Sequence, residues 1–408
     1  MKRYVVLGAS AAGISGADML RKLDKEAEIL LISEETEIYS KCIMHYYMSG
    51  DKTKEQISFI NKTFLKDNRI CWKKGKRAVK INCTEKKVFL EDGEGVSYDK
   101  LLIATGSRGY LPPVKGLDNA ENVCAFHTLG DCEIVLKKAC TARNIVILGA
   151  GLVGVDAAYG LLHLKKRITM LDVNSHMMAV QLDQRAADIY EKEFDKRGVH
   201  QIYNTGIKEA LKDDDGRIRE LILTDGKTLP CDLLIIAAGT RANTELLEQT
   251  DLKRDQYGLL INEYSQTSDR SVYGAGDITG KNMVWPSAAK EAMTAAYHMT
   301  GTKFPMTDFF KGKATIHTFN IPTMAYGLPK APDDSYTVEI KEKENGSYQK
   351  VIHKEGKIFG MILQGDLYFA GILNQLISTK ADIRKLDKPV LELEYGDLIG
   401  SSREVGHI

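Results

Sequence analysis

The sequence lacks any apolar run that approaches the roughly 18 residues needed to span a bilayer. It also lacks an excess of either charge: 56 Lys and Arg face 55 Asp and Glu, for a net charge of +1. No overall field therefore attracts nucleic acid or an anionic membrane. The amino terminus, Met1-Lys2-Arg3, leads directly into a short apolar run ending at Gly8, which does not resemble a signal peptide. We expect a cytoplasmic protein with neither nucleic acid nor membrane as partner.

The cysteines show no metal-binding or paired spacing. There are seven, at positions 42, 71, 83, 124, 132, 140 and 231, and they form no Cys-x-x-Cys pair and no zinc-ligand pattern. An odd number in a large chain indicates free thiols, most of them small buried apolar side chains. We expect no metal site, and no second cysteine to form a disulfide beside Cys42. A chain of 408 residues is too long for one core, so two or three domains are expected.

A glycine pattern typical of dinucleotide binding occurs twice. The first copy, Gly8-Ala9-Ser10-Ala11-Ala12-Gly13, lies between a predicted strand at 4–7 and a predicted helix at 15–22, with a second strand at 28–32. The second copy, Gly149-Ala150-Gly151-Leu152-Val153-Gly154, lies between strands predicted at 145–148 and 168–171, with a helix through 164. Both copies therefore sit in a strand–loop–helix–strand unit, the context that gives the pattern meaning.

The chemistry of the two loops is the same. The first glycine permits a tight turn, the second position lets the backbone approach a pyrophosphate, and the third packs the helix on the strand. The helix amino terminus then presents free N–H groups to the phosphates. An acid after the second strand should hold ribose hydroxyls: Glu34, with Glu35 as a rival, in the first copy, and Asp172 in the second. Because an acid there disfavours a 2′-phosphate, Asp172 favours NADH over NADPH.

Two further segments extend the pattern to a family. Residues 98–108, Tyr-Asp-Lys-Leu-Leu-Ile-Ala-Thr-Gly-Ser-Arg, and residues 271–278, Ser-Val-Tyr-Gly-Ala-Gly-Asp-Ile, stand in the expected order with both glycine loops. Over residues 1–300 the chain resembles the FAD-dependent pyridine nucleotide-disulfide oxidoreductases. The resemblance implies an α/β fold with two Rossmann-like domains, for FAD and NAD(P)H, and a small α+β C-terminal domain. The implied boundaries are 1–110 with 246–305 for FAD, 111–245 for NAD(P)H, and 306–408 for the C-terminal domain.

The resemblance also implies residue roles. Asp277 would bind a ribitol hydroxyl, segments 104–106 and 238–240 would be crossovers beside flavin and nicotinamide, and the helix start near 285–288 would lie at the flavin edge. Asp156 stands where relatives often place Glu near the nicotinamide. The predicted cofactor-binding residues are Gly8, Ser10, Ala11, Ala12, Gly13, Glu34, Glu35, Lys41, Val79, Ala104, Thr105, Gly106, Gly149, Gly151, Leu152, Val153, Gly154, Asp156, Asp172, Ala238, Gly239, Gly276, Asp277, Ser287 and Ala288.

The hypotheses differ in how electrons leave the flavin for the acceptor. In the family, the stretch at 39–50 runs past the flavin, with a basic residue such as Lys41 near its polar edge. Rubredoxin reductases and NADH-dependent nitrite reductases often have Pro at the place of Cys42, whereas CoA-disulfide reductases, persulfide reductases and related NADH oxidases have one redox cysteine there. Cys42 to Gly50 resembles the Cys-x-x-x-Tyr-Tyr-x-x-Gly spacing of the second group. A helix start and His45 at i+3 would favour a thiolate. Lys41 and Cys42 are the predicted catalytic residues.

The C-terminal region favours the first group. Residues 335–366 alternate in short runs broken by Asn345-Gly346 and Glu355-Gly356, which predicts hairpins, and a helix is predicted near 368–378. This resembles the small C-terminal domain of rubredoxin and nitrite reductases. The leading hypothesis is an FAD-dependent oxidoreductase that takes hydride from NADH and passes electrons to a small redox protein such as rubredoxin. The alternatives are a Cys42-dependent reductase of CoA disulfide or persulfide, or an NADH oxidase, and a nucleotide-binding protein without turnover. Monomer and homodimer both stay open.

Overall fold

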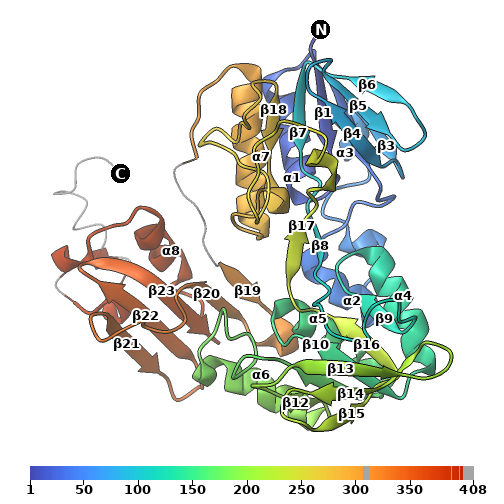
Figure 1. The fold of residues 1–408 in the computed structure, drawn as a ribbon. Coiled ribbons are helices and arrows are strands. Elements are labelled where there is room, and N and C mark those ends of the chain that lie inside the picture. The colour runs from blue at the N-terminus through green and yellow to red at the C-terminus, as the bar shows by residue number, and fades with distance from the viewer. Residues whose placement is uncertain (307–312, 387, 395, 398–408) are drawn as a thin grey trace. The chain divides into compact units, whose positions relative to one another are not determined.

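The computed structural model describes residues 1–306, 313–386, 388–394 and 396–397 (Figure 1). Contacts divide the chain into two compact units. One comprises Met1–Pro112, Ala125–Lys137 and Ala238–Phe309, and the other Pro113–Cys124, Lys138–Ala237 and Phe310–Ile408. The three-domain division given above stays a prediction. In the part of the chain that the structure describes, no helix has the length and apolar character needed to cross a membrane.

The first unit is built on a parallel sheet with the strand order β18-β7-β1-β2-β3. The strands are β1 (Arg3–Leu7), β2 (Glu28–Ser33), β3 (Ile70–Lys74), β7 (Lys100–Ile103) and β18 (Val272–Gly274). Most of their residues are apolar and buried, as expected for a sheet covered on both faces. Helices α1 (Ala11–Leu23) and α7 (Trp285–Thr300) pack side by side (Figure 1).

Alternate residues of β1 belong to different cores. Tyr4 and Val6 join the cluster formed with α1 and α7, whereas Val5 and Leu7 join a cluster that includes Val88 of a small antiparallel sheet. That small sheet consists of β4 (Ala78–Asn82), β5 (Lys87–Leu90) and β6 (Gly95–Ser97). The shorter elements of this unit are α2 (Met44–Met48), α3 (Phe64–Asp67), β8 (Ser107–Gly109) and β17 (Thr240–Ala242). The period-2 alternation of a strand thus supplies both layers around the sheet.

The second unit repeats this design around the second glycine loop. Its sheet has the order β12-β11-β10-β16-β9, with parallel pairing of β11 to β12 and of β10 to both β11 and β16. The bounds are β9 (Val123–Ala125), β10 (Asn144–Leu148), β11 (Arg167–Leu171), β12 (His200–Ile202) and β16 (Leu233–Ile236), with α5 (Leu152–Leu161) and α6 (Gln184–Lys196). Helix α4 (Leu129–Thr141) belongs to the first unit up to Lys137 and to the second from Lys138. A three-stranded antiparallel sheet follows, of β13 (Ile207–Lys212), β14 (Ile218–Leu223) and β15 (Thr228–Pro230).

The C-terminal part of the second unit is a five-stranded antiparallel sheet. Its order is β19-β20-β23-β22-β21, from β19 (Ala314–Ile316), β20 (Thr323–Gly327), β21 (Thr337–Glu342), β22 (Tyr348–Lys354) and β23 (Lys357–Gln364), with α8 (Ala370–Ser378) after it. Both predicted hairpins are confirmed. The second turns at Glu355 and Gly356, whose φ angles of +49° and +76° are those of a primed hairpin turn. The predicted helix is confirmed as α8.

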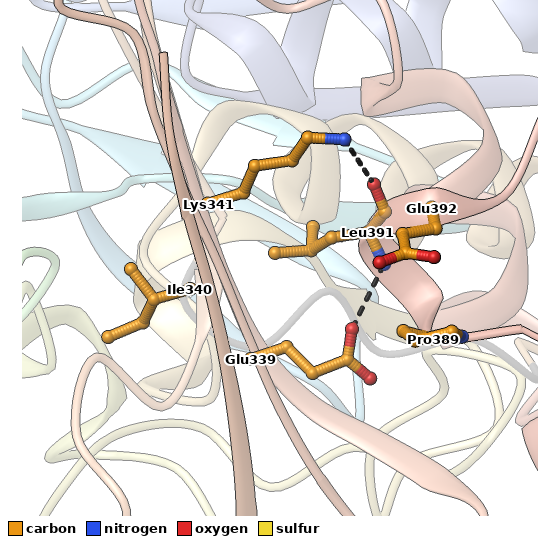
Figure 2. A pocket seen from close by; sticks show the side chains of 6 residues that line it. All are labelled: Glu339, Ile340, Lys341, Pro389, Leu391 and Glu392. Atoms are coloured by element: carbon orange, nitrogen blue, oxygen red, sulfur yellow. Dashed lines mark hydrogen bonds between the residues drawn. The ribbon is translucent and has the colours of Figure 1, made fainter.

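The edge strand β21 is tied to the short helix η8 (Val390–Glu392). The carboxylate of Glu339 accepts hydrogen bonds from the backbone N–H groups of Val390, at 3.1 Å, and Leu391, at 3.0 Å. Lys341 donates to the backbone carbonyl of Leu391 at 3.3 Å. Figure 2 shows Glu339, Lys341 and Leu391 around the pocket that they line with Ile340, Pro389 and Glu392. None of the residues lining this pocket is among the predicted cofactor contacts.

Candidate functional site

The first glycine loop is shaped by close backbone contacts. Gly8 has a φ of +108°, and a Cβ there would lie 2.1 Å from the carbonyl oxygen of Ala104. A Cβ on Gly13 would lie 1.8 Å from the carbonyl oxygen of Gly8. The helix α1 begins at Ala11, earlier than the predicted residue 15, and Ser10 forms no side-chain cap. The loop therefore places the helix amino terminus directly at the strand end, where its first N–H groups can bind a phosphate.

Three predicted segments converge beside this loop. Gly276, after β18, has a φ of +78°, and a Cβ there would lie 3.1 Å from the Cβ of Ala12 and 3.4 Å from that of Ala288. The starts of α1 and α7 therefore meet at the turn that carries Asp277. Ser287 is fully buried on α7, which begins at Trp285 with Pro at its first turn, as predicted. These contacts bring residues 12, 276 and 288 into one cradle, which fits the phosphate and ribitol portion of a dinucleotide.

The two crossover segments also lie together. Residues 104–106 lead into β8, which pairs with β17 after residues 238–239, and Tyr110 donates a backbone hydrogen bond to Gly239 at 2.9 Å. Asn243 donates from its side chain to the carbonyl oxygen of Thr105 at 2.9 Å. The Thr105 hydroxyl is buried and has no hydrogen-bond partner among the described residues. A buried hydroxyl of this kind usually finds a partner, so the site fits a ligand with polar groups.

The acids after β2 differ in environment. Glu34 is exposed and lies 3.8 Å from Arg77, while Glu35 accepts a hydrogen bond from the Tyr39 hydroxyl at 2.9 Å. Burial raises the pKa of Glu35 above its usual value, and the Tyr39 hydrogen bond opposes that rise. Glu34 is therefore the more accessible of the two acids for ribose hydroxyls. Val79 lies on β4 with 49% of its surface exposed.

Lys41 and Cys42 lie in a single 3-10 turn, Lys41–Ile43, before α2. The expected helix start at Cys42 is corrected here, because α2 begins at Met44 and has five residues. So short a helix contributes little of a macrodipole to the thiol. Cys42 is exposed, whereas His45 is buried with its ring centroid 4.2 Å from that of Tyr46. The turn thus exposes the thiol beside a partly buried lysine.

Two residues that sequence reasoning did not select complete this region. The His127 ring nitrogen Nε2 lies 3.0 Å from Lys41 Nζ and 3.3 Å from Ser107 Oγ. The Ser107 hydroxyl donates to a carboxylate oxygen of Asp277 at 2.6 Å. Ser107 follows the 104–106 crossover directly, which was a usable signal. His127 belongs to no motif, and only the fold brings it here.

The second glycine loop, in the other unit, repeats the close contacts of the first. Gly149 has a φ of +110°, and a Cβ on Gly154 would lie 1.9 Å from the carbonyl oxygen of Gly149. A Cβ on Gly151 would meet nothing within 4 Å among the described residues. Gly154 is therefore required by helix packing, whereas Gly151 leaves open the approach that a pyrophosphate needs.

Around this loop, the predicted contacts lie at the start of α5 and at the end of β11. Leu152 and Val153 are the first two residues of α5, and Asp156 follows within it, partly buried. One oxygen of Asp172 accepts from the backbone N–H of Ala150 at 2.6 Å, and the other accepts from Asn174. Asp172 is thus fixed against the loop, and the oxygen that accepts from Ala150 keeps a further lone pair for a ribose hydroxyl.

Comparison with known proteins identifies similar chains. Residues 2–292 match the family described as pyridine nucleotide-disulphide oxidoreductase, and residues 314–381 match the rubredoxin NAD+ reductase C-terminal domain. The chain is 26% identical over 402 residues to the assimilatory nitrate reductase electron transfer subunit of Bacillus subtilis (strain 168), covering 96% of this chain but 51% of that protein. The chain thus spans about half the length of that relative.

A second relative matches over nearly its whole length. The NADH-dependent phenylglyoxylate dehydrogenase subunit epsilon of Aromatoleum evansii is 26% identical over 401 residues, with 94% of this chain and 93% of that protein covered. Among solved structures, NADH:rubredoxin oxidoreductase from Clostridium acetobutylicum has the same fold, with a TM-score of 0.74 at 19% identity over 98% of this chain and 99% of that one.

Proposed function

The chain belongs to the pyridine nucleotide-disulphide oxidoreductase family, and from that premise we propose that it takes hydride from NADH onto FAD and passes the electrons to a small redox protein of the rubredoxin type. The observation that carries the choice of acceptor is the match of residues 314–381 to the rubredoxin NAD+ reductase C-terminal domain. The two glycine loops, each beside a parallel sheet, support the other part of the proposal, the binding of two nucleotides.

The residues of the first unit fit FAD. The cradle of residues 12, 276 and 288 would receive its phosphates, Asp277 its ribitol, and the buried Thr105 hydroxyl a polar group of the cofactor. FAD supplies the hydride-accepting and electron-passing chemistry, and the protein supplies position and charge. Lys41 would place a cation beside the polar edge of the flavin, where it favours the electron-rich form.

The residues of the second unit fit NADH. The open face of Gly151 would admit the pyrophosphate, and the α5 amino terminus would face it. Asp172 is a fixed acid at the ribose position, and its charge would repel a 2′-phosphate. We therefore propose NADH as the electron donor and NADPH as the poorer one.

One observation favours a second function. Cys42 is exposed on the turn that carries Lys41, so a thiol stands where a disulfide or persulfide substrate could reach it. In this alternative, the reduced enzyme cleaves the sulfur–sulfur bond of CoA disulfide or of a persulfide through Cys42, or it reduces oxygen. An exposed thiol is a requirement of this chemistry but does not by itself activate the sulfur.

Two measurements test these functions: the first applies to both, and the second separates them. Purified protein should be yellow with bound FAD and should bleach when NADH is added without oxygen; a protein that takes up no FAD would exclude both. Cys42→Ala should then reduce rubredoxin as fast as Cys71→Ala, a matched variant at another exposed cysteine. Loss of CoA-disulfide or persulfide reduction in Cys42→Ala alone, together with loss of a long-wavelength thiolate–flavin band, would instead establish the thiol function.

A further inference from the structure

His127 lies beside Lys41, a predicted cofactor residue, and beside Ser107, which hydrogen-bonds to a second one, Asp277. Its Nε2 atom lies 3.0 Å from Lys41 Nζ and 3.3 Å from Ser107 Oγ, and the Ser107 hydroxyl donates to Asp277 at 2.6 Å. The four residues, Lys41, His127, Ser107 and Asp277, are a group of neighbouring polar side chains inside the first unit.

The loop that carries His127 is held by hydrogen bonds of its own. The Asp131 carboxylate accepts from the backbone N–H groups of His127, at 3.0 Å, and Thr128, at 2.8 Å, while the Asp131 N–H donates to the Thr128 hydroxyl at 3.1 Å. This is the reciprocal capping arrangement of a helix start. Leu129 donates its N–H to the Tyr39 hydroxyl at 2.9 Å, which ties the loop to the segment before Lys41. The position of His127 is therefore fixed by Asp131 in the helix that follows it and by Tyr39 in the segment before Lys41.

The burial of His127 and the charge of Lys41 favour a neutral imidazole at His127. Burial, followed by the nearby Lys41 charge, lowers the pKa of His127 to about 4, and the carboxylates of Asp277 and Asp131 oppose this only in part. Burial also lowers the pKa of Lys41, against the opposing charges of Asp277, Glu35, Asp131 and Glu34. An ammonium group can only donate, so Lys41 donates to Nε2 and the imidazole proton lies on Nδ1. His127 is the acceptor that a partly buried ammonium needs.

We propose that His127 is a positioning residue that holds the Lys41 ammonium at the flavin site by accepting its hydrogen bond at Nε2. The inference rests on the proposed function, because Lys41 and Asp277 are FAD contacts only there. Its consequence is electrostatic: by supplying an acceptor, His127 keeps a positive charge beside the flavin. A cation there favours the electron-rich form of the cofactor and so raises its midpoint potential.

The test measures the midpoint potential of the bound flavin in variants of the full chain. His127→Leu removes the acceptor, and we expect a fall of about 30 mV, equal to a tenfold change in the equilibrium constant of a two-electron couple. His127→Gln keeps an acceptor oxygen and should recover most of the potential. His298→Leu is the matched control, because His298 lies in the same unit but bonds to Tyr273 and stacks on Tyr264. It should leave the potential unchanged.

A second background checks that the effect passes through Lys41. In Lys41→Met, the further change His127→Leu should have no effect on the potential. A full fall in that background, or a wild-type potential in His127→Leu with FAD bound, would overturn the inference and leave the proposed function standing. Failure of the wild-type protein to bind FAD would instead count against the proposed function.

A measurement on the wild-type holoprotein does not depend on how the leucine variant folds. With ¹⁵N-labelled histidine, one imidazole should stay neutral from pH 8 down to pH 5, with its proton on Nδ1, and its Nε2 signal should move in Lys41→Met. A His127 resonance that titrates near its ordinary pKa, or one unaffected by Lys41→Met, would contradict the inference.

Discussion

Glu291 carries a carboxyl group into the interior of the first unit, where only 1% of its surface is exposed. It accepts a hydrogen bond from the backbone N–H of Gly276 at 2.8 Å and lies within 3.5 Å of the Thr279 hydroxyl. Burial raises its pKa to about 7, although these hydrogen bonds and Lys281 oppose the rise. The residue thus supports the turn beside Asp277 while holding a proton that an exposed glutamate would lose.

We predict that Glu291 makes stability fall with pH between about 4.5 and 7. The folded chain binds a proton in that window which the unfolded chain has released, so the free energy of unfolding decreases as the pH rises. Glu291→Gln cannot titrate and should show a flatter dependence, measured as the urea midpoint from pH 4.5 to 8. Glu85→Gln, at an exposed position, is the control and should follow the wild type. Parallel curves for all three proteins would contradict the prediction.

At the scale of the element, the glycines of the two loops are of two kinds. Gly13 and Gly154 face the carbonyl oxygens of Gly8 and Gly149, where a Cβ would come within 2 Å. Gly151 faces open space, and its φ of −76° suits any residue. Helix packing therefore explains the third glycine of each motif, and ligand approach explains Gly151, whose place in the first motif is taken by Ser10.

Substitution by alanine should have different effects at the two kinds of glycine. Gly154→Ala forces α5 away from β10 and should cost about 1–3 kcal/mol of stability, as overpacking does. Gly151→Ala should stay within about 0.5 kcal/mol of wild type but weaken NADH binding about tenfold, or ~1.4 kcal/mol. Urea unfolding and NADH titration measure the two effects. Equal losses of stability in both variants would mean that Gly151 also serves packing.

The predicted elements themselves follow from local chemistry. The strands and helices around both loops and the C-terminal hairpins lie where the apolar periodicity and turn residues place them. The helix α1 begins at Ala11 rather than 15, so the last three residues of the glycine motif belong to the helix. The expected helix at Cys42 is shortened to a 3-10 turn followed by five helical residues, so the thiol loses the expected dipole.

At the scale of the whole molecule, a buried ion pair joins two parts of the second unit, the start of α6 and the C-terminal sheet. Lys350 of β22 lies 2.6 Å from the carboxylate of Asp183, and their side chains are 9% and 16% exposed. Asp183 also caps α6 through the N–H of Ala186, at 3.0 Å, and accepts from the Tyr348 hydroxyl at 2.7 Å. One carboxylate therefore connects α6 with the C-terminal sheet.

We predict that Lys350→Met destabilises the second unit by about 3–5 kcal/mol, because it leaves the Asp183 charge buried without its partner. Lys343→Met is the control: it breaks the pair with Asp366, in which the lysine side chain is 40% exposed, and should cost less than about 1 kcal/mol. Urea unfolding followed by circular dichroism compares them. Similar small losses in both would show that Asp183 is satisfied by its other donors.

The sequence by itself determined the two nucleotide loops, the strands that flank them and the C-terminal hairpins. Each of these is a continuous stretch in which turn chemistry and apolar periodicity act over a few residues. Family resemblance extended this to FAD, NADH and the class of reaction. The choice between a protein acceptor and a thiol mechanism rested on Cys42, and that choice is one for experiment.

Only the tertiary structure decided which polar groups share an environment. Lys41 and His127 are 86 residues apart, and Ser107 and Asp277 are 170 apart, so no local pattern relates them. Their contact depends on a capped helix start and on strands that return to the same edge of a sheet. Burial depends on the whole packed core in the same way, and the shifted pKa values of Glu291 and His127 follow from it.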